Sequence, residues 1–247
     1  MTRDRTAFAL FGTTATEPAP RLLRAGGLTA EFANGNLRAI RFEGTEILRA
    51  IAFLVRDRDW GTCDLALSAV DINETENGFS LTYAGTCEGP GGSRLQVAAE
   101  IHGEPSGRLS FNAKASSSTG FETNRCGFCI LHPVVGLAGE PARIEYVDGR
   151  IEDTRFPDLI EPWQPFREMR AITHRVMPGV TAECRMEGDT FEMEDQRNWS
   201  DASFKTYVRP LALPWPYRIE PDEPAEQRIR LSVRDERKAA RPSLHPG

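Results

Sequence analysis

Short segments in which apolar and polar residues alternate recur along most of this chain. Two of them, 28–33 and 37–42, flank the dipeptide Asn34-Gly35. A period of two places successive side chains on opposite faces of a β-strand. Asn-Gly between two such runs is a strong signal for a tight β-hairpin. We therefore predict a hairpin over residues 28–42.

Similar runs follow at short intervals, separated by turns that contain Gly, Pro, Asn or Asp. The expected strands after the first hairpin are 50–55, 79–86, 94–102, 108–115, 125–131, 142–147, 181–187, 190–194, 204–209 and 227–233. A helical period of 3.6 residues is not sustained over three turns in any segment. About a dozen short strands predict an all-β fold, a large antiparallel β-sandwich with no internal repeat and no second domain.

The ends of the chain differ in composition from this patterned region. Residues 1–25 are rich in Thr, Pro, Ala and Arg, and we expect a partly disordered N-terminal arm there. The patterned region, 26–235, is expected to form a single β-sandwich domain, with a charged C-terminal tail at 236–247. Within the domain, 152–167 carries several Pro-aromatic pairs, which are incompatible with a helix or a central strand. We expect it to form an ordered loop over one end of the sheets.

The stretch 190–210 is the most unusual part of the chain, because two alternating runs enclose a dense polar segment. Glu192 and Glu194 fall on one face of the first run, opposite Phe191 and Met193. If the two runs pair as strands, Lys205 on the second run lies on the same face as these carboxylates. A surface corner held by salt bridges would account for this pattern, but we favour the wall of a polar pocket.

Side chains of this kind suit a neutral sugar, which needs planar hydrogen-bonding groups, both charge signs and an aromatic face. The interpretation places Glu194 or Asp195 as a general base and His132, at the end of a predicted strand, as the acid. The expected substrate-binding residues are Glu192, Arg197, Asn198, Asp201, Lys205, Trp163 and Trp199.

Composition excludes several other classes of protein. The chain has 30 Lys and Arg against 36 Asp and Glu, interleaved without a basic stripe, so nucleic acid is not an expected partner. There is no nucleophile elbow around a serine, no phosphate-binding glycine loop and no dinucleotide motif. We expect no cofactor.

The five cysteines do not have the spacing of a disulfide framework. Cys126 and Cys129 form a CxxC pair, but no second pair completes a zinc site, and residues three apart on a strand point to opposite faces. We expect buried, reduced thiols and no metal. The apolar patch at 7–11 is shorter than the core of a signal peptide, and no run is long enough to cross a bilayer. These features predict a cytoplasmic protein without a membrane partner.

Three segments carry a resemblance to a known family: 124–133 (NRCGFCILHP), 156–166 (FPDLIEPWQPF) and above all 191–217 (FEMEDQRNWSDASFKTYVRPLALPWPY). They resemble the N-terminal β-sandwich region of bacterial D-apionate lactonase-type proteins, over roughly residues 26–235. The resemblance implies a sandwich of the galactose-mutarotase type (a supersandwich) and a sugar-acid or sugar-lactone context. Members of this family are longer and continue into a barrel domain.

These observations leave three functions open. The first is a carbohydrate-active enzyme acting on a sugar, sugar acid or sugar lactone, with a hydrolase that opens a sugar lactone as the favoured case. The second is a mutarotase-like epimerase, in which a carboxylate and a histidine act on the anomeric centre. The third is a non-catalytic carbohydrate-binding or assembly module that works with a separate catalytic barrel protein. A small sugar or sugar acid is the expected ligand in each case, and a homo-oligomer is the other expected assembly.

Overall fold

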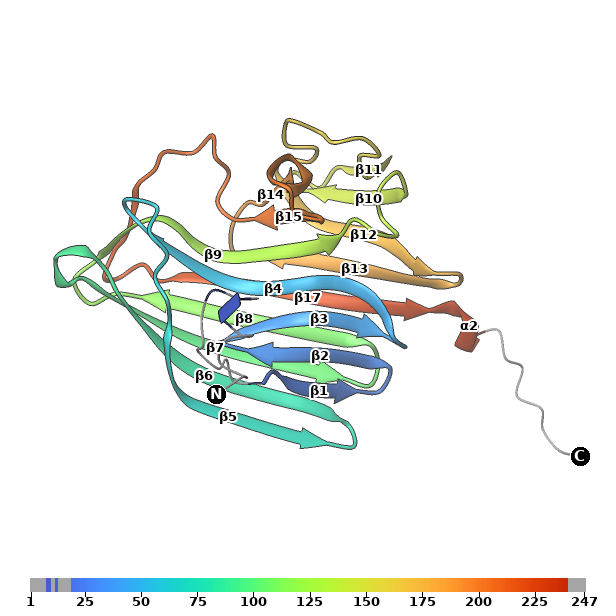
Figure 1. Ribbon diagram of the computed structural model, residues 1–247, viewed down its shortest axis with the longest axis horizontal. Helices are drawn as coiled ribbons and strands as arrows, with labels where there is room; N and C mark the ends of the chain where they lie inside the picture. The colour runs from blue at the N-terminus through green and yellow to red at the C-terminus, as the bar shows by residue number, and fades with distance from the viewer. Residues whose placement is uncertain (1–7, 10–11, 13–18, 240–247) are drawn as a thin grey trace, which may run out of the picture.

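The computed structural model describes residues 8, 9, 12 and 19–239, and within them the chain forms two antiparallel sheets that pack face to face (Figure 1). One sheet contains, in spatial order, β1 (Arg21–Ala25), β2 (Leu28–Ala33), β3 (Asn36–Phe42), β4 (Thr45–Asp57), β9 (Phe121–Pro133), β15 (Ser203–Tyr207) and β14 (Glu192–Asp195), and β16 (Tyr217–Ile219) also pairs with β9. The other contains β11 (Ile151–Arg155), β10 (Pro141–Tyr146), β12 (Met169–Met177), β13 (Val180–Glu187), β17 (Ala225–Asp235), β8 (Arg108–Ser116), β7 (Arg94–Glu104), β6 (Gly78–Glu88) and β5 (Ala66–Thr75). We call them the eight-stranded and the nine-stranded sheet.

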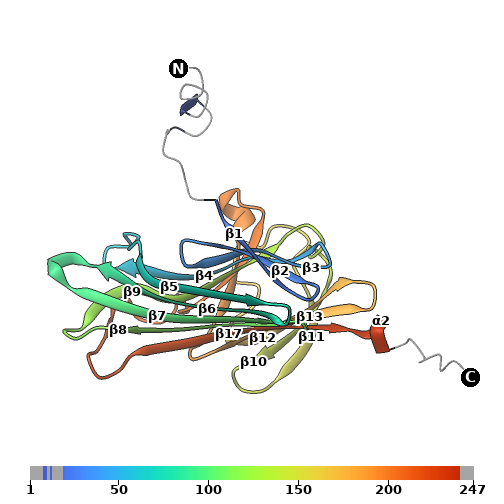
Figure 2. The ribbon, with the colours of Figure 1, turned by 90° about the horizontal axis from the view of Figure 1, so that it is seen from below.

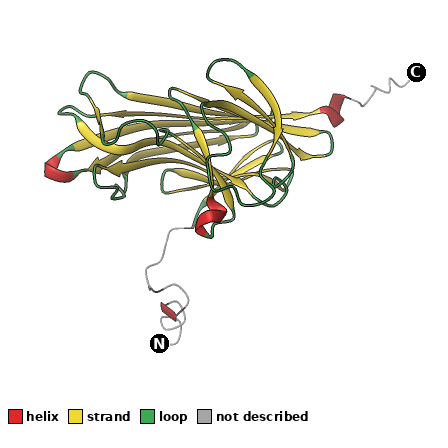
Figure 3. Ribbon diagram, turned by 90° about the horizontal axis from the view of Figure 1, so that it is seen from above, coloured by secondary structure: helices red, strands yellow, loops and turns green. Residues whose placement is uncertain are grey.

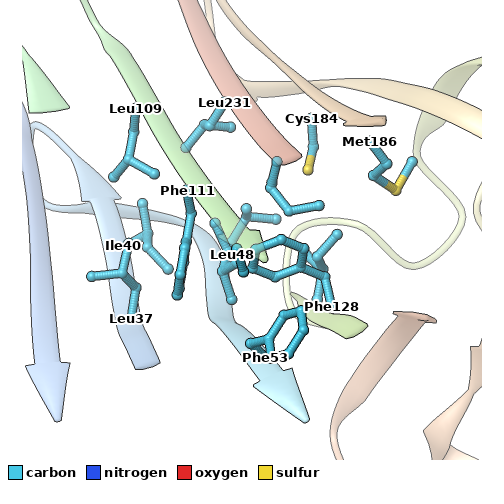
Figure 4. Close-up of a cluster of buried hydrophobic side chains, with 14 of the residues drawn as sticks. Leu37, Ile40, Leu48, Phe53, Leu109, Phe111, Phe128, Cys184, Met186 and Leu231 are labelled. Carbon is cyan, nitrogen blue, oxygen red and sulfur yellow. The ribbon is translucent and has the colours of Figure 1, made fainter. Parts of the chain in front are cut away.

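The core lies between the two sheets and is built by the alternation that the sequence shows. In Figure 2 the layers are seen from the side, with β2, β3 and β4 above β8, β17 and β12. Phe128 of β9 contacts Phe53 of its own sheet edge-to-face at 5.3 Å and Phe111 of the nine-stranded sheet at 4.9 Å (Figure 4). Such aromatic pairs add to the hydrophobic free energy of burial. Apolar residues at every second position of most strands therefore join the sheets.

The fold class is confirmed, since strands account for 62% of the structure and helix for 5% (Figure 3). The predicted hairpin is present as β2 and β3, with Asn34 and Gly35 both at positive φ in the turn. The short helical segments include η1 (Pro90–Gly92), η2 (Gln196–Trp199) and α2 (Glu236–Ala239). Among the described residues no helix has the length and apolar character that a membrane span requires.

The structure corrects the predicted elements in several places. The first strand begins at Arg21 rather than after residue 25, because Leu23 and Ala25 are buried against the core. The segment expected to be a loop from residue 152 contains β11, whose alternating residues pair with β10. β5 was not predicted, since its side chains are largely exposed and give little hydrophobic pattern. The predicted tail begins as α2, and the remainder of both predicted ends lies outside the described residues.

The central stretch of the sequence lies at one edge of the eight-stranded sheet. β14 and β15 form an antiparallel pair joined by η2, and β15 pairs in turn with β9. In Figure 1 this unit lies at the top of the view, beside β10 and β11, and the segment after β15 loops outward at the upper left. The face of the eight-stranded sheet that points away from the nine-stranded sheet is called the outer face below.

Candidate functional site

Glu194 and Lys205 face each other across β14 and β15 on the outer face. The predicted alternation is confirmed here, because Phe191 and Met193 are buried in the core while Glu194 pairs with Lys205 in register. Lys205 Nζ lies 2.8 Å from Glu194 Oε2, and the indole Nε1 of Trp199 donates to Oε1 of the same carboxylate at 2.8 Å. The two charged side chains are only 19% and 24% exposed, so water screens the pair incompletely.

The environment of Glu194 favours its ionised form. Partial burial acts to raise the pKa of Glu194, but the hydrogen bonds from Lys205 and Trp199 outweigh it, and the net pKa is lowered from its ordinary value. The positive charges of Lys205 and Arg125 act in the same direction. Glu194 is therefore a carboxylate at neutral pH, able to accept a hydrogen bond or a proton but not to act as a general acid.

Glu192 lies on the same strand face but is covered. Its Oε1 accepts hydrogen bonds from the Tyr207 hydroxyl at 2.6 Å and from the backbone N–H of Leu211 at 2.8 Å. Only 4% of Glu192 is exposed, and Tyr207 is fully buried. Glu192 thus anchors the start of the segment after β15 through Leu211.

Asp195, Arg197 and Asn198 hold the Pro-aromatic loop in place. The Asp195 carboxylate has no exposed surface and accepts from the Arg197 guanidinium at 2.7 Å and from the backbone N–H of Glu161 at 3.0 Å. Arg197 also donates to the carbonyl oxygens of residues 157, 158 and 159, and the Asn198 amide donates to that of Glu161. Burial acts to raise the pKa of Asp195, but the hydrogen bonds from Arg197 and the Glu161 backbone N–H, with the Arg197 charge, together outweigh it, and the net pKa is lowered. The hydrogen bonds of Asp195, Arg197 and Asn198 described here are thus made to other parts of the protein.

His132 lies on the other side of the sheet from Glu194. It shares the core-facing parity of Phe128 and Ile130 on β9, has no exposed surface, and its Nε2 is 2.9 Å from the Thr206 hydroxyl. Burial, with a smaller effect of His174, lowers the pKa of His132 to about 3. The structure therefore does not bring His132 and Glu194 to one pocket, because strand alternation sends them to opposite faces.

Asp201 lines a groove of about 550 Å³ on the outer face, next to the Glu194–Lys205 pair. Its neighbour is Arg49, with 3.7 Å between the guanidinium and the carboxylate, and Arg49 also donates to the Ala202 carbonyl. Leu131, the register partner of Lys205, contributes to the groove floor, so the two features are contiguous. Further polar lining residues are Glu31, Asn36, Arg38, Glu46 and Ser203.

The two predicted tryptophans are both on the surface. Trp199 is 72% exposed and covers Glu194 with its indole N–H. Trp163 is 71% exposed in the Pro-aromatic loop, close in sequence to the exposed Leu159 and Ile160. Trp199 thus has a ring face available beside the charged pair.

The sequence interpretation missed a group of residues farther along the outer face. Arg56 and Arg125 are register partners on β4 and β9, and Trp60 and Trp215 lie beside them with their rings 5.4 Å apart. The alternation along β9 could have indicated the outward position of Arg125, because Arg125 lies on the same strand face as Cys129 and Leu131. Cys126 and Cys129 fall on opposite faces, as expected, with only Cys126 in the core.

Comparison with solved structures defines the class of this sandwich. An aldose epimerase homologue from C. elegans superposes with a TM-score of 0.52 at 8% identity, covering 88% of this chain and 99% of that one. A putative mutarotase from Salmonella typhimurium gives a TM-score of 0.50 at 12% identity, covering 93% and 99%. Similarity at this level concerns the fold alone. The domain is an antiparallel β-sandwich of the galactose-mutarotase-like type.

The particular family follows from the sequence. The profile of the family described as "D-apionate lactonase, N-terminal domain" matches residues 8–236, and the chain belongs to this family. A D-apionate lactonase from Brucella anthropi is 59% identical over 233 residues, which is 94% of this chain and 38% of that protein. The chain therefore spans well under half the length of this relative.

Proposed function

We propose that this domain binds a sugar, a sugar acid or a sugar lactone on the outer face of the eight-stranded sheet, as the N-terminal part of a D-apionate lactonase-type activity. The observation that carries the proposal is the Glu194–Lys205 pair with the Trp199 indole N–H on its carboxylate. Together they offer an acceptor, a cationic donor and an exposed ring face within one surface. Those three features match the hydroxyls and C–H faces of a sugar.

The adjoining groove extends this surface. Its lining mixes carboxylates and guanidinium groups, among them Asp201 and Arg49, and its volume of about 550 Å³ is in the range of small-molecule sites. A ligand that lies along the groove would reach Lys205 past Leu131. We assign Glu194, Lys205, Trp199 and Asp201 to direct ligand contact. Asp195, Arg197 and Asn198 support the same surface by fixing η2 and the Pro-aromatic loop.

A catalytic role for Glu194 is the second candidate. The lowered pKa of Glu194 keeps it ionised at neutral pH, which suits a general base that activates water against a lactone carbonyl. His132 is enclosed in the core and is not assigned as its acid partner, and the same burial argues against the epimerase alternative. In this scheme the acid is supplied elsewhere, by a further domain, a separate catalytic partner or a second copy of the chain.

Titration calorimetry with D-apionate and its lactone tests the binding proposal. Glu194→Gln should weaken binding at least about 10-fold, because a charge-assisted hydrogen bond contributes roughly 1.5–3 kcal/mol. The matched control is Glu226→Gln, which removes a carboxylate paired with Lys114 on the nine-stranded sheet. Equal binding by the two variants would contradict the proposal.

Lactone hydrolysis by the isolated domain separates the two candidates. A rate that is lost in Glu194→Gln and retained in Glu226→Gln supports a general base. Ligand binding without hydrolysis supports a binding domain that depends on a catalytic partner.

A further inference from the structure

Two arginines lie directly opposite each other on the outer face. Arg56 of β4 and Arg125 of β9 are register partners, and Arg125 has the parity of Cys129, which faces outward. Like charges directly opposite on neighbouring strands destabilise a sheet unless something compensates them. A nearby arginine shows the usual arrangement, in which an arginine pairs with a carboxylate: Arg58 lies 2.7 Å from Glu122.

Within the described part of the chain, neither of these arginines has a carboxylate partner. Among the residues that the structure describes, no acidic oxygen lies within 4.0 Å of the Arg56 or Arg125 guanidinium. The Nε of Arg125 is shielded from solvent and has no hydrogen-bond acceptor. A half-buried guanidinium with an unsatisfied donor is unfavourable, and it is relieved when an anion binds.

Aromatic rings hold Arg125 in position instead, and a hydroxyl holds Arg56. The guanidinium carbon of Arg125 lies 4.2 Å from the ring centre of Tyr207 and 5.7 Å from that of Trp60. Trp60 packs edge-to-face against Trp215, and Arg56 donates to the Thr62 hydroxyl. Contact with the rings restrains the Arg125 guanidinium without using its N–H donors. The arginines are thus oriented before a ligand arrives.

We propose that Arg56 and Arg125 form a subsite for the carboxylate of an acyclic sugar acid. This inference rests on the proposed function and deepens it, since it states that the outer face takes an aldonate rather than only an uncharged sugar. A carboxylate matches the planar donors of guanidinium in a bidentate manner. Trp60 and Trp215, 37% and 54% exposed, supply apolar surface for the carbon chain.

The neighbouring groups agree with a ligand that carries one negative charge and several hydroxyls. Arg125 is near enough to Glu194 for its charge to act on that carboxylate, and both arginines act on the intervening Cys129 thiol. The hydroxyl end of the ligand therefore extends toward Glu194 and Lys205. The Glu194 carboxylate, on which the Arg125 charge acts, offsets part of the positive charge, which favours a carboxylate over a phosphate dianion.

Titration calorimetry at low salt provides the test, with D-gluconate as the aldonate, D-glucitol as its uncharged counterpart and inorganic phosphate as the competing anion. Arg125→Gln and Arg56→Gln should each weaken D-gluconate binding at least about 10-fold and leave D-glucitol binding unchanged. Arg58→Gln, which removes a nearby paired arginine, should bind D-gluconate as the native domain does. Arg125→Lys should recover part of the affinity, since it keeps the charge but loses the planar donors.

Equal D-gluconate affinity in Arg125→Gln and Arg58→Gln, with both variants folded by circular dichroism, would overturn the subsite. Tighter binding of phosphate than of D-gluconate would overturn its assignment to a carboxylate. If D-glucitol binding still depends on Glu194 in either case, the proposed function stands and only this inference fails. Absence of binding of both D-gluconate and D-glucitol to the native domain would overturn both.

Discussion

Glu194 and Lys205 form an ion pair 2.8 Å long in which each partner is less than a quarter exposed. It lies at the edge of the eight-stranded sheet, next to a polar groove and on the same outer face as the register partners Arg56 and Arg125. Partial burial makes the pair stronger than a fully solvated one and costly to break on one side only. Stability and ligand binding are therefore expected to depend on the same two residues.

Removal of the cation should cost stability. Lys205→Met leaves Glu194 half-buried without its partner, and we expect the free energy of unfolding to fall by about 1–2 kcal/mol, between the values for surface and buried pairs. Lys114→Met, which breaks the exposed pair with Glu226, should cost less than about 0.5 kcal/mol. Urea unfolding measures both. Equal losses would show that the Glu194–Lys205 pair has no special strength.

Asp195 should be far more important for stability than its chemistry alone suggests. Asp195→Asn removes the charge that holds Arg197 and the Pro-aromatic loop, and we expect a loss of about 3 kcal/mol. The amide of Glu161, which donates to Asp195, should exchange its hydrogen faster. Asp153→Asn is the matched control, since that aspartate also binds an arginine through two oxygens but is 72% exposed. A similar loss in both variants would contradict the structural role of Asp195.

Two buried histidines should make the domain sensitive to mild acid. Burial lowers the pKa of His132 to about 3 and that of His174 to about 4, while in the unfolded chain both titrate near 6.5. Below pH 6.5 the unfolded state binds more protons than the folded state, so stability falls as the pH falls toward 4. Each histidine accounts for about 1.4 kcal/mol per pH unit, or about 2 kcal/mol between pH 6.5 and 5.

The His132→Gln variant tests this directly. Its stability should fall by about 2 kcal/mol less than that of the native domain between pH 6.5 and 5. Above pH 7.5, where both histidines are neutral in either state, the slope of stability against pH should be the same for the two proteins. An unchanged slope below pH 6.5 would show that His132 is accessible to protons in the folded state.

The cysteines should differ in reactivity according to their burial. Cys87, Cys126, Cys129 and Cys184 are buried, and burial raises the pKa of Cys129 to about 11 and of Cys126 and Cys184 to about 12. We expect a thiol reagent to modify the partly exposed Cys63 first and the others only on unfolding. Protein purified without a chelator should contain less than one equivalent of zinc, since Cys126 and Cys129 point to opposite faces. Rapid modification of all five, or stoichiometric zinc, would contradict this account.

Alternation along the strands was sufficient to predict which residues share a face, but not which face is the open one. It placed Glu194 and Lys205 together, as the structure has them. The same rule applied to β9 puts His132 with Phe128 and Ile130 in the core, and applied to β14 puts Asp195 with Met193. His132 and Asp195 lie at the ends of their strands, which suggested that they line a pocket. The sequence does not reveal that other segments of the protein cover these strand ends.

The alternation of apolar and polar residues does not predict which distant segments of the chain contact one another. The strands β5 to β8 lie between Arg56 and Arg125 in the sequence. Only the pairing of β4 with β9 makes these two residues neighbours. Trp60 and Trp215 meet for a similar reason, from loops at the same end of the sandwich. The aromatic character of each was evident from the sequence, but their proximity depends on strand order.

Chemical-shift mapping of the isotope-labelled domain during titration with D-apionate locates the ligand on the molecule. We expect shifts in the backbone amides of Arg125, Cys129, Glu194, Trp199 and Lys205 on the outer face of the eight-stranded sheet. The amides of Glu100, Asn112, Lys114, Glu226 and Arg228, which line a shallow pocket on the nine-stranded sheet, should not move. Shifts confined to that second group, or no shifts at saturating ligand, would contradict the assignment of the outer face as a sugar-binding surface.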